Sequence, residues 1–186
     1  VLRSVTPFQL MMGKLLGLMG VSLTLAVLYL GAAYGLANYY DVADLLTPGI
    51  LIWFVVFLVL AVILYGSLFI AVGAACSTLS ETQSMLWPVM LITTLPLFVW
   101  LNVAREPSSP FSTVASLVPT FTPILMVIRL AVPPGIPWWQ PVLGMALMLL
   151  TTVAAVYAAG RIFRIGILMQ GKGANYRDML RWIVRG

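Results

Sequence analysis

Histidine is absent from this sequence, and cysteine occurs only once, at Cys76. Without histidine there is no Ser-His-Asp triad, no histidine ligand for zinc and no histidine proton relay. A single cysteine excludes a disulfide within the chain and a metal site built from several cysteines. An intramembrane enzyme is therefore the least favoured class, and we expect no catalytic, metal-binding or cofactor-binding residue.

Charged residues are also scarce, at 8% of 186 residues, whereas 62% are hydrophobic. A soluble domain carries about 25% charged residues. So few charges cannot cover a water-exposed surface. The net charge of +5 comes from cations that cluster at particular loops, so it indicates topology rather than nucleic-acid binding. The composition predicts an all-α, polytopic membrane protein in contact with lipids.

Four apolar runs are long enough to cross a bilayer core of about 30 Å, which needs about 20 helical residues. We place these spans at residues 15–37, 50–76, 85–103 and 139–160. In the first run, Gly13 and Gly17, and again Gly31 and Gly35, have the spacing that lets helices pack closely. This packing could lie within one subunit or between two copies.

Prolines interrupt the second half of the sequence. Pro88 and Pro96 predict bends in the third span. Residues 105–138 contain short apolar pieces, in which Thr122 is a candidate N-cap and Pro123 a first helical residue. A helix that starts there meets two prolines after about 15 Å, half of a bilayer. We therefore predict a re-entrant or interfacial helical hairpin between the third and fourth spans.

Positive residues predict the orientation, because cytoplasmic loops are enriched in lysine and arginine. With four spans, Arg3, Lys14 and the six cations of residues 161–186 share one side, and only Arg105 and Arg129 lie on the other. The sequence thus predicts that both ends of this chain, including the tail, are cytoplasmic. Counting the hairpin as a fifth span would move the tail cations outside.

The sequence lacks the residues that ion-coupled transport and ATP binding would each require. The four spans contain no carboxylate, which an ion-coupled carrier would be expected to use. The phosphate-binding pattern Gly-x4-Gly-Lys-Ser/Thr is also missing. A transport protein of this kind would take its energy from a partner subunit. A scaffold subunit that transports nothing, or a secondary carrier with coupling residues elsewhere, are the alternatives.

Three stretches, taken in order, resemble ABC-2 type permeases of the sodium- and drug-export group. Residues 4–17 are similar to a loop that often reads Ser-Pro followed by Gly-Lys, although a threonine stands here where serine is common. Residues 73–83 resemble the next cytoplasmic turn, and there Ser80 is a candidate N-cap with Gln83 as its partner. Residues 119–129 are similar to a Pro-x-x-Thr-Pro-x-x-Met-x-x-Arg stretch outside the membrane.

The resemblance implies the C-terminal part of a six-span bacterial inner-membrane permease. Two permease copies would work with two ATP-binding cassette subunits, which alone would bind ATP. A short helix lying across the end of the first span would receive the force of ATP-driven closure. The implied ATPase-coupling contact comprises Arg3, Ser4, Thr6, Pro7, Phe8, Lys14, Glu81 and Gln83. The implied extracytoplasmic gate hairpin contains Pro119, Thr122, Pro123 and Arg129.

The residues themselves also allow plainer roles. Arg3 and Lys14 would serve equally well as anchors at the lipid headgroups. Arg129 could extend its charge to the outer interface without gating anything. Glu81 could be only a negative charge that complements the dipole at a helix start.

Overall fold

The computed structural model describes residues 6–41, 47–133 and 135–168. Arg3, Ser4 and the cations beyond residue 168 fall outside these residues. The described chain forms seven α-helices. Their bounds are α1 Pro7–Tyr39, α2 Pro48–Ala75, α3 Leu79–Thr94, α4 Pro96–Arg105, α5 Pro110–Leu117, α6 Thr122–Ala131 and α7 Trp139–Leu168.

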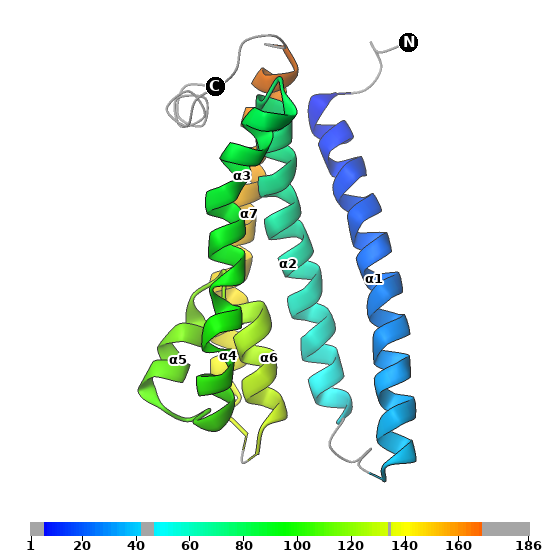
Figure 1. Ribbon diagram of the computed structural model, residues 1–186, viewed down its shortest axis with the longest axis vertical. Coiled ribbons are helices and arrows are strands. Elements are labelled where there is room, and N and C mark those ends of the chain that lie inside the picture. Colours follow the sequence, from blue (N-terminus) through cyan, green and yellow to red (C-terminus); the bar gives the residue numbers. More distant parts are fainter. Residues whose placement is uncertain (1–5, 42–46, 134, 169–186) are drawn as a thin grey trace.

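Four stretches of the described chain are long and apolar enough to cross a membrane: α1, α2, α3 together with α4, and α7. The prediction of four spans is confirmed. The predicted hairpin is also confirmed, as the short helices α5 and α6 between α4 and α7. The start of α1 and the end of α7 lie at one end of the bundle, and the hairpin lies toward the other (Figure 1).

The first span differs from its prediction. The expected separate helix across its end is wrong, because α1 runs as one helix for 33 residues, about 50 Å. Thr6 caps this helix: its hydroxyl accepts the Gln9 N–H at 3.3 Å, and the Gln9 side chain accepts the Thr6 N–H at 2.9 Å. Pro7 occupies the first turn, where no donor is lost. Since 50 Å exceeds the bilayer core of about 30 Å, α1 extends beyond the core at one end or both.

Two predicted helix starts are also corrected. The N-cap of α3 is Thr78, not Ser80, because the Thr78 hydroxyl accepts the Glu81 N–H at 3.3 Å. Thr122 is the first residue of α6 rather than its N-cap. Its hydroxyl is occupied as a donor to the Val118 carbonyl at 2.9 Å, so it does not cap the following amides.

Local chemistry explains the break within the third span and the end of the fourth. Pro96, which has no N–H to donate, begins α4 and divides the third span there. The fourth span was expected to end at residue 160, but α7 continues through Arg161 and Arg164. Arginine is a good helix former, and the Arg161 guanidinium lies 4.9 Å from the centre of the Tyr157 ring one turn earlier.

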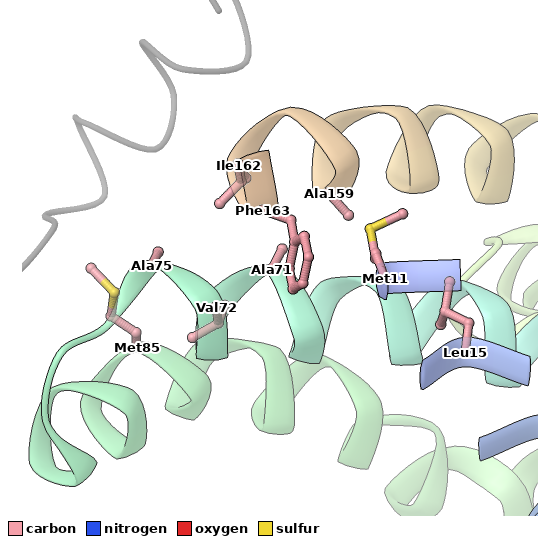
Figure 2. Close-up of a cluster of buried hydrophobic side chains, with 9 residues drawn as sticks. All are labelled: Met11, Leu15, Ala71, Val72, Ala75, Met85, Ala159, Ile162 and Phe163. Carbon is pink, nitrogen blue, oxygen red and sulfur yellow. The ribbon is translucent and has the colours of Figure 1, made fainter. Parts of the chain in front are cut away.

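The buried side chains form two clusters. One joins α1, α2, α3 and α7 near the start of α1 (Figure 2). It contains Met11, Leu15, Ala71, Val72, Ala75, Met85, Ala159, Ile162 and Phe163. The other contains Phe57, Leu64, Met126 and Met148, and thereby attaches the hairpin helix α6 to α2 and α7.

Glycines show where helices do and do not approach. A Cβ added at Gly13, Gly17, Gly31 or Gly35 would meet no atom within 4 Å, so these residues do not mediate packing within the described chain. Packing between copies stays a prediction. At Gly166 of α7, by contrast, an added Cβ would lie 2.8 Å from the Ala74 carbonyl carbon of α2. The two backbones can approach this closely only because residue 166 has no side chain.

Candidate functional site

The hairpin is organised around Arg129, in the last turn of α6, whose side chain is 0% exposed. Its guanidinium donates four hydrogen bonds to groups on other elements. The acceptors are the Pro107 carbonyl (from Nε, 2.7 Å), Ser116 Oγ (from Nη1, 2.6 Å), and Thr113 Oγ1 and Gln140 Oε1 (from Nη2, 3.1 and 2.7 Å). One side chain therefore ties α6 to the α4–α5 loop, to α5 and to the start of α7.

All four acceptors of Arg129 are neutral, which is unusual for a buried charge. Burying an ion costs several kcal/mol, and hydrogen bonds to a charged group return about 1.5–3 kcal/mol each. Because the charge needs all of its acceptors, the arrangement of the hairpin is strongly constrained. The alternative that Arg129 extends to the outer interface is wrong, since its side chain is fully buried.

The loop before α5 is shaped to present one of these acceptors. The Ser109 hydroxyl caps α5 by accepting the Ser112 N–H at 3.1 Å. The Ser112 hydroxyl donates to the Glu106 carbonyl at 2.7 Å. These two bonds close the turn on both sides of Pro107, whose carbonyl then faces Arg129.

The tip of the hairpin reaches deep into the bundle. The Tyr65 hydroxyl of α2 donates to the Thr120 carbonyl, in the non-helical residues between α5 and α6. Tyr65 lies about 25 Å along α2 from its first residue, Pro48. Non-helical backbone at this depth requires a partner within the protein. The hairpin is thus re-entrant, and Tyr65 satisfies a carbonyl at its tip.

Three of the four predicted gate residues lie at this tip, and the fourth, Arg129, lies about 10 Å further along α6. Pro119 lies in the turn, and Pro123 in the first turn of α6. Thr122 is fully buried, and a Cβ added at Gly144 of α7 would lie 3.2 Å from its methyl group. The structure therefore brings Pro119, Thr122 and Pro123 together at the tip, whereas Arg129 holds the hairpin nearer its base. Whether they gate a pathway stays a prediction.

Tyr65→Phe tests this contact. Removal of the hydroxyl leaves the Thr120 carbonyl without its donor, and an unsatisfied buried group costs about 1–3 kcal/mol. We expect the free energy of unfolding in mixed micelles to fall by this amount. Tyr34→Phe, on the exposed side of α1, should change it by less than about 0.5 kcal/mol. Equal effects of the two substitutions would contradict a role for Tyr65 at the tip.

The predicted coupling residues of α1 lie at the opposite end of the bundle. Thr6 and Pro7 form its capped first turn. Phe8 is 51% exposed, and its ring lies against α7, where a Cβ added at Gly160 would be 3.3 Å away. The Lys14 ammonium lies 5.8 Å from the centre of the Phe163 ring of α7.

The second predicted coupling stretch is the turn between α2 and α3. The Glu81 carboxylate accepts the Ser77 N–H at 3.0 Å, so this side chain closes the turn, as expected of a charge at a helix start. Gln83 is exposed in the second turn of α3. A cavity of about 510 Å³ lies between this turn, α1 and α7, with Lys14, Ser77 and Phe163 in its lining. The two predicted stretches thus share one end of the bundle.

Sequence reasoning missed the partners of Arg129 and the donor at the hairpin tip. Thr113, Ser116 and Gln140 accept from Arg129, and Tyr65 donates to the tip. One signal was present: a buried arginine without a nearby acid requires neutral acceptors, and residues 108–116 are rich in serine and threonine. Tyr65 gave no comparable signal within its apolar span.

A family model described as ABC-2 family transporter protein matches residues 1–161. The uncharacterized protein YhaP of Bacillus subtilis is 27% identical over 189 residues, and the uncharacterized protein MJ1024 of Methanocaldococcus jannaschii is 23% identical over 177 residues. Each alignment covers 95% of this chain but only 45% and 43% of the relatives, so the chain spans less than half of their length.

No solved structure matches the chain. The family model, however, covers well over half of the sequence, and it includes α1 to α6 and most of α7. The four apolar helices make the chain an integral membrane protein. The chain belongs to the ABC-2 family of transporter proteins, the membrane components of ABC transporters.

Proposed function

We propose that the chain is the membrane-spanning permease part of an exporter driven by a separate ATP-binding cassette subunit. The observation that carries the proposal is the separation of two ends. The capped start of α1 and the α2–α3 turn share one end of the bundle, and the hairpin held by Arg129 lies toward the other (Figure 1). A force received at one end of the bundle could therefore be transmitted through the spans to the hairpin at the other end.

The unbroken α1 gives this proposal a mechanical form. Met11 and Leu15, in the early turns of α1, are buried against α2 and α7. Closure of an ATPase dimer against Thr6, Pro7 and Phe8 would displace α1 along its whole length, because the helix has no hinge after them. The spans would then rock between states open to opposite sides, and no residue would perform covalent chemistry.

The described cations support a cytoplasmic position for the start of α1. Lys14 and Arg164 are exposed near this end of the bundle. Arg129 is enclosed by protein at the other end, which leaves Arg105 as the exposed cation among the described residues there. The positive-inside rule then favours the orientation expected from the sequence, in a bacterial inner membrane.

Co-purification tests the proposal. The full-length protein should retain an ATP-binding subunit, and proteoliposomes containing both should export substrate only with ATP. Lys14→Gln should reduce retention several-fold, because a rim charge contributes modestly to a contact. Arg105→Gln, which removes an exposed cation at the hairpin end, is the matched control and should have no effect. Failure of the unsubstituted protein to retain an ATPase, or transport driven by an ion gradient alone, would overturn the proposal.

A further inference from the structure

Two adjoining hollows lie on one side of α7. The first is an apolar groove of about 380 Å³, lined by Phe8 of α1, Leu60 and Ile63 of α2, and Leu149, Val153 and Tyr157 of α7. The second, of about 300 Å³, is lined by Thr6, Pro7, Phe8, Gly160 and Arg164. Phe8 lines both, so the groove continues into the cavity around its ring. We call the pair the α1–α7 groove.

The α1–α7 groove changes from apolar to cationic along α7. Leu149, Val153, Tyr157, Gly160 and Arg164 recur every three or four residues and so share one face of the helix. From Leu149 to Arg164 this face extends about 22 Å. Near the cationic end of the groove, the Arg161 guanidinium lies 4.9 Å from the centre of the Tyr157 ring. The groove is therefore amphipathic in the direction in which a lipid lies in a membrane.

The apolar part offers little to a polar ligand. The hydroxyl of Thr152, which also lines it, donates to the Met148 carbonyl at 2.8 Å and is thereby satisfied. Val153 and Tyr157 are 62% and 60% exposed, although both lie in a helix that crosses the membrane. A hydrocarbon chain is the natural occupant of such a surface at this depth.

We propose that the α1–α7 groove binds one phospholipid with an anionic headgroup. Its acyl chain would lie along Leu149, Val153 and Tyr157, and its phosphate would contact Arg161 and Arg164. Cationic pockets between transmembrane helices on the cytoplasmic side bind anionic headgroups. The charge of the cavity and the apolar groove beside it together match such a lipid better than a neutral lipid. The proposal rests on the cytoplasmic orientation proposed above but not on export, because the groove is formed by the described helices alone.

The bound lipid would have a structural consequence for α1. Thr6, Pro7 and Phe8 form one wall of the headgroup cavity, and Gly160 and Arg164 form the other. A headgroup between them would join the first turn of α1 to the last turns of α7. Loss of the lipid would then loosen the end of the bundle at which α1 begins.

Native mass spectrometry of the full-length protein tests the site. The protein is equilibrated in detergent with equal amounts of phosphatidylglycerol and phosphatidylcholine. Each arginine near an anionic headgroup contributes about fivefold, equivalent to about 1 kcal/mol. Arg161→Gln/Arg164→Gln should therefore reduce retained phosphatidylglycerol by about 25-fold and leave phosphatidylcholine unchanged. Arg105→Gln should change neither. Equal retention by the unsubstituted protein and the double variant would overturn the proposal.

A second pair of variants tests the acyl-chain part. Val153→Trp fills the groove and should lower phosphatidylglycerol retention at least fivefold. Val21→Trp places the same ring on α1, where Val21 is 61% exposed, and should have no effect. An equal loss in both variants would show ordinary lipid contact and would overturn the proposal. The proposal would also be overturned if a second copy of the chain occupied the groove and no lipid were retained.

Discussion

Arg129→Met is expected to lower the free energy of unfolding by about 3–4 kcal/mol. The substitution leaves the Pro107 carbonyl and the Gln140 side-chain oxygen buried without their donor, and each such group costs about 1–3 kcal/mol. Relief of the buried charge offsets part of this loss. Arg129→Lys should be intermediate, because an ammonium cannot reproduce the planar set of donors. Unfolding by sodium dodecyl sulfate in bicelles measures the difference.

A double-mutant cycle distinguishes the loss of the Arg129–Gln140 hydrogen bond from a general effect of changing the size of either side chain. Gln140→Leu should lower the free energy of unfolding by about 1.5–3 kcal/mol, the contribution of a hydrogen bond to a charged group. Adding it to Arg129→Met should cost less than the two single effects together, because the amide oxygen that lost its donor is then gone. Arg105→Met, at an exposed cation, should fall within about 0.5 kcal/mol of the unsubstituted protein. Strict additivity would contradict the proposed coupling.

Gly166→Ala should also destabilise the protein. The new Cβ would lie 2.8 Å from the Ala74 carbonyl carbon and 3.2 Å from the Ala75 nitrogen. These are backbone atoms, so α2 and α7 would have to move apart, at the cost of about 1–3 kcal/mol that overpacking typically brings. The contact belongs to the same end of the bundle as Ile162 and Phe163 (Figure 2), so their cluster should loosen too.

Gly73→Ala is the matched control for this substitution. Gly73 lies in α2 at the same end, but nothing lies within 4 Å of its added Cβ. Alanine favours the helix there by up to about 1 kcal/mol, so this variant should unfold at an equal or higher detergent fraction. If both variants were equally destabilised, the close approach of α2 and α7 would not be the cause.

The number of spans could be predicted from sequence because it depends on local properties. Apolar length determines which helices can cross a bilayer, and the prolines at 119, 133 and 134 determine that the hairpin helices stay short. The unbroken start of α1 was missed for an equally local reason. Thr6 and Gln9 form a capping box, a pattern readable in the sequence, which starts the helix well before the apolar run.

The contacts of the hairpin could not be predicted in the same way. Arg129 stood out as a charge among apolar residues, but its acceptors come from 11 to 22 residues away in the sequence and from three other elements. Tyr65 and Thr120 are 55 residues apart. Such pairings depend on how the helices pack, and one sequence does not contain that information.

The depth of the hairpin tip also determines how far it lies from the end of the bundle at which α1 begins. From Tyr65, which contacts the tip, to the end of α2 at Ala75 is about 15 Å of helix. That is roughly half of the 30 Å bilayer core. A helical distance of half the core therefore separates the hairpin tip from the α2–α3 turn, and a movement at that turn has to be transmitted over this length to reach the hairpin.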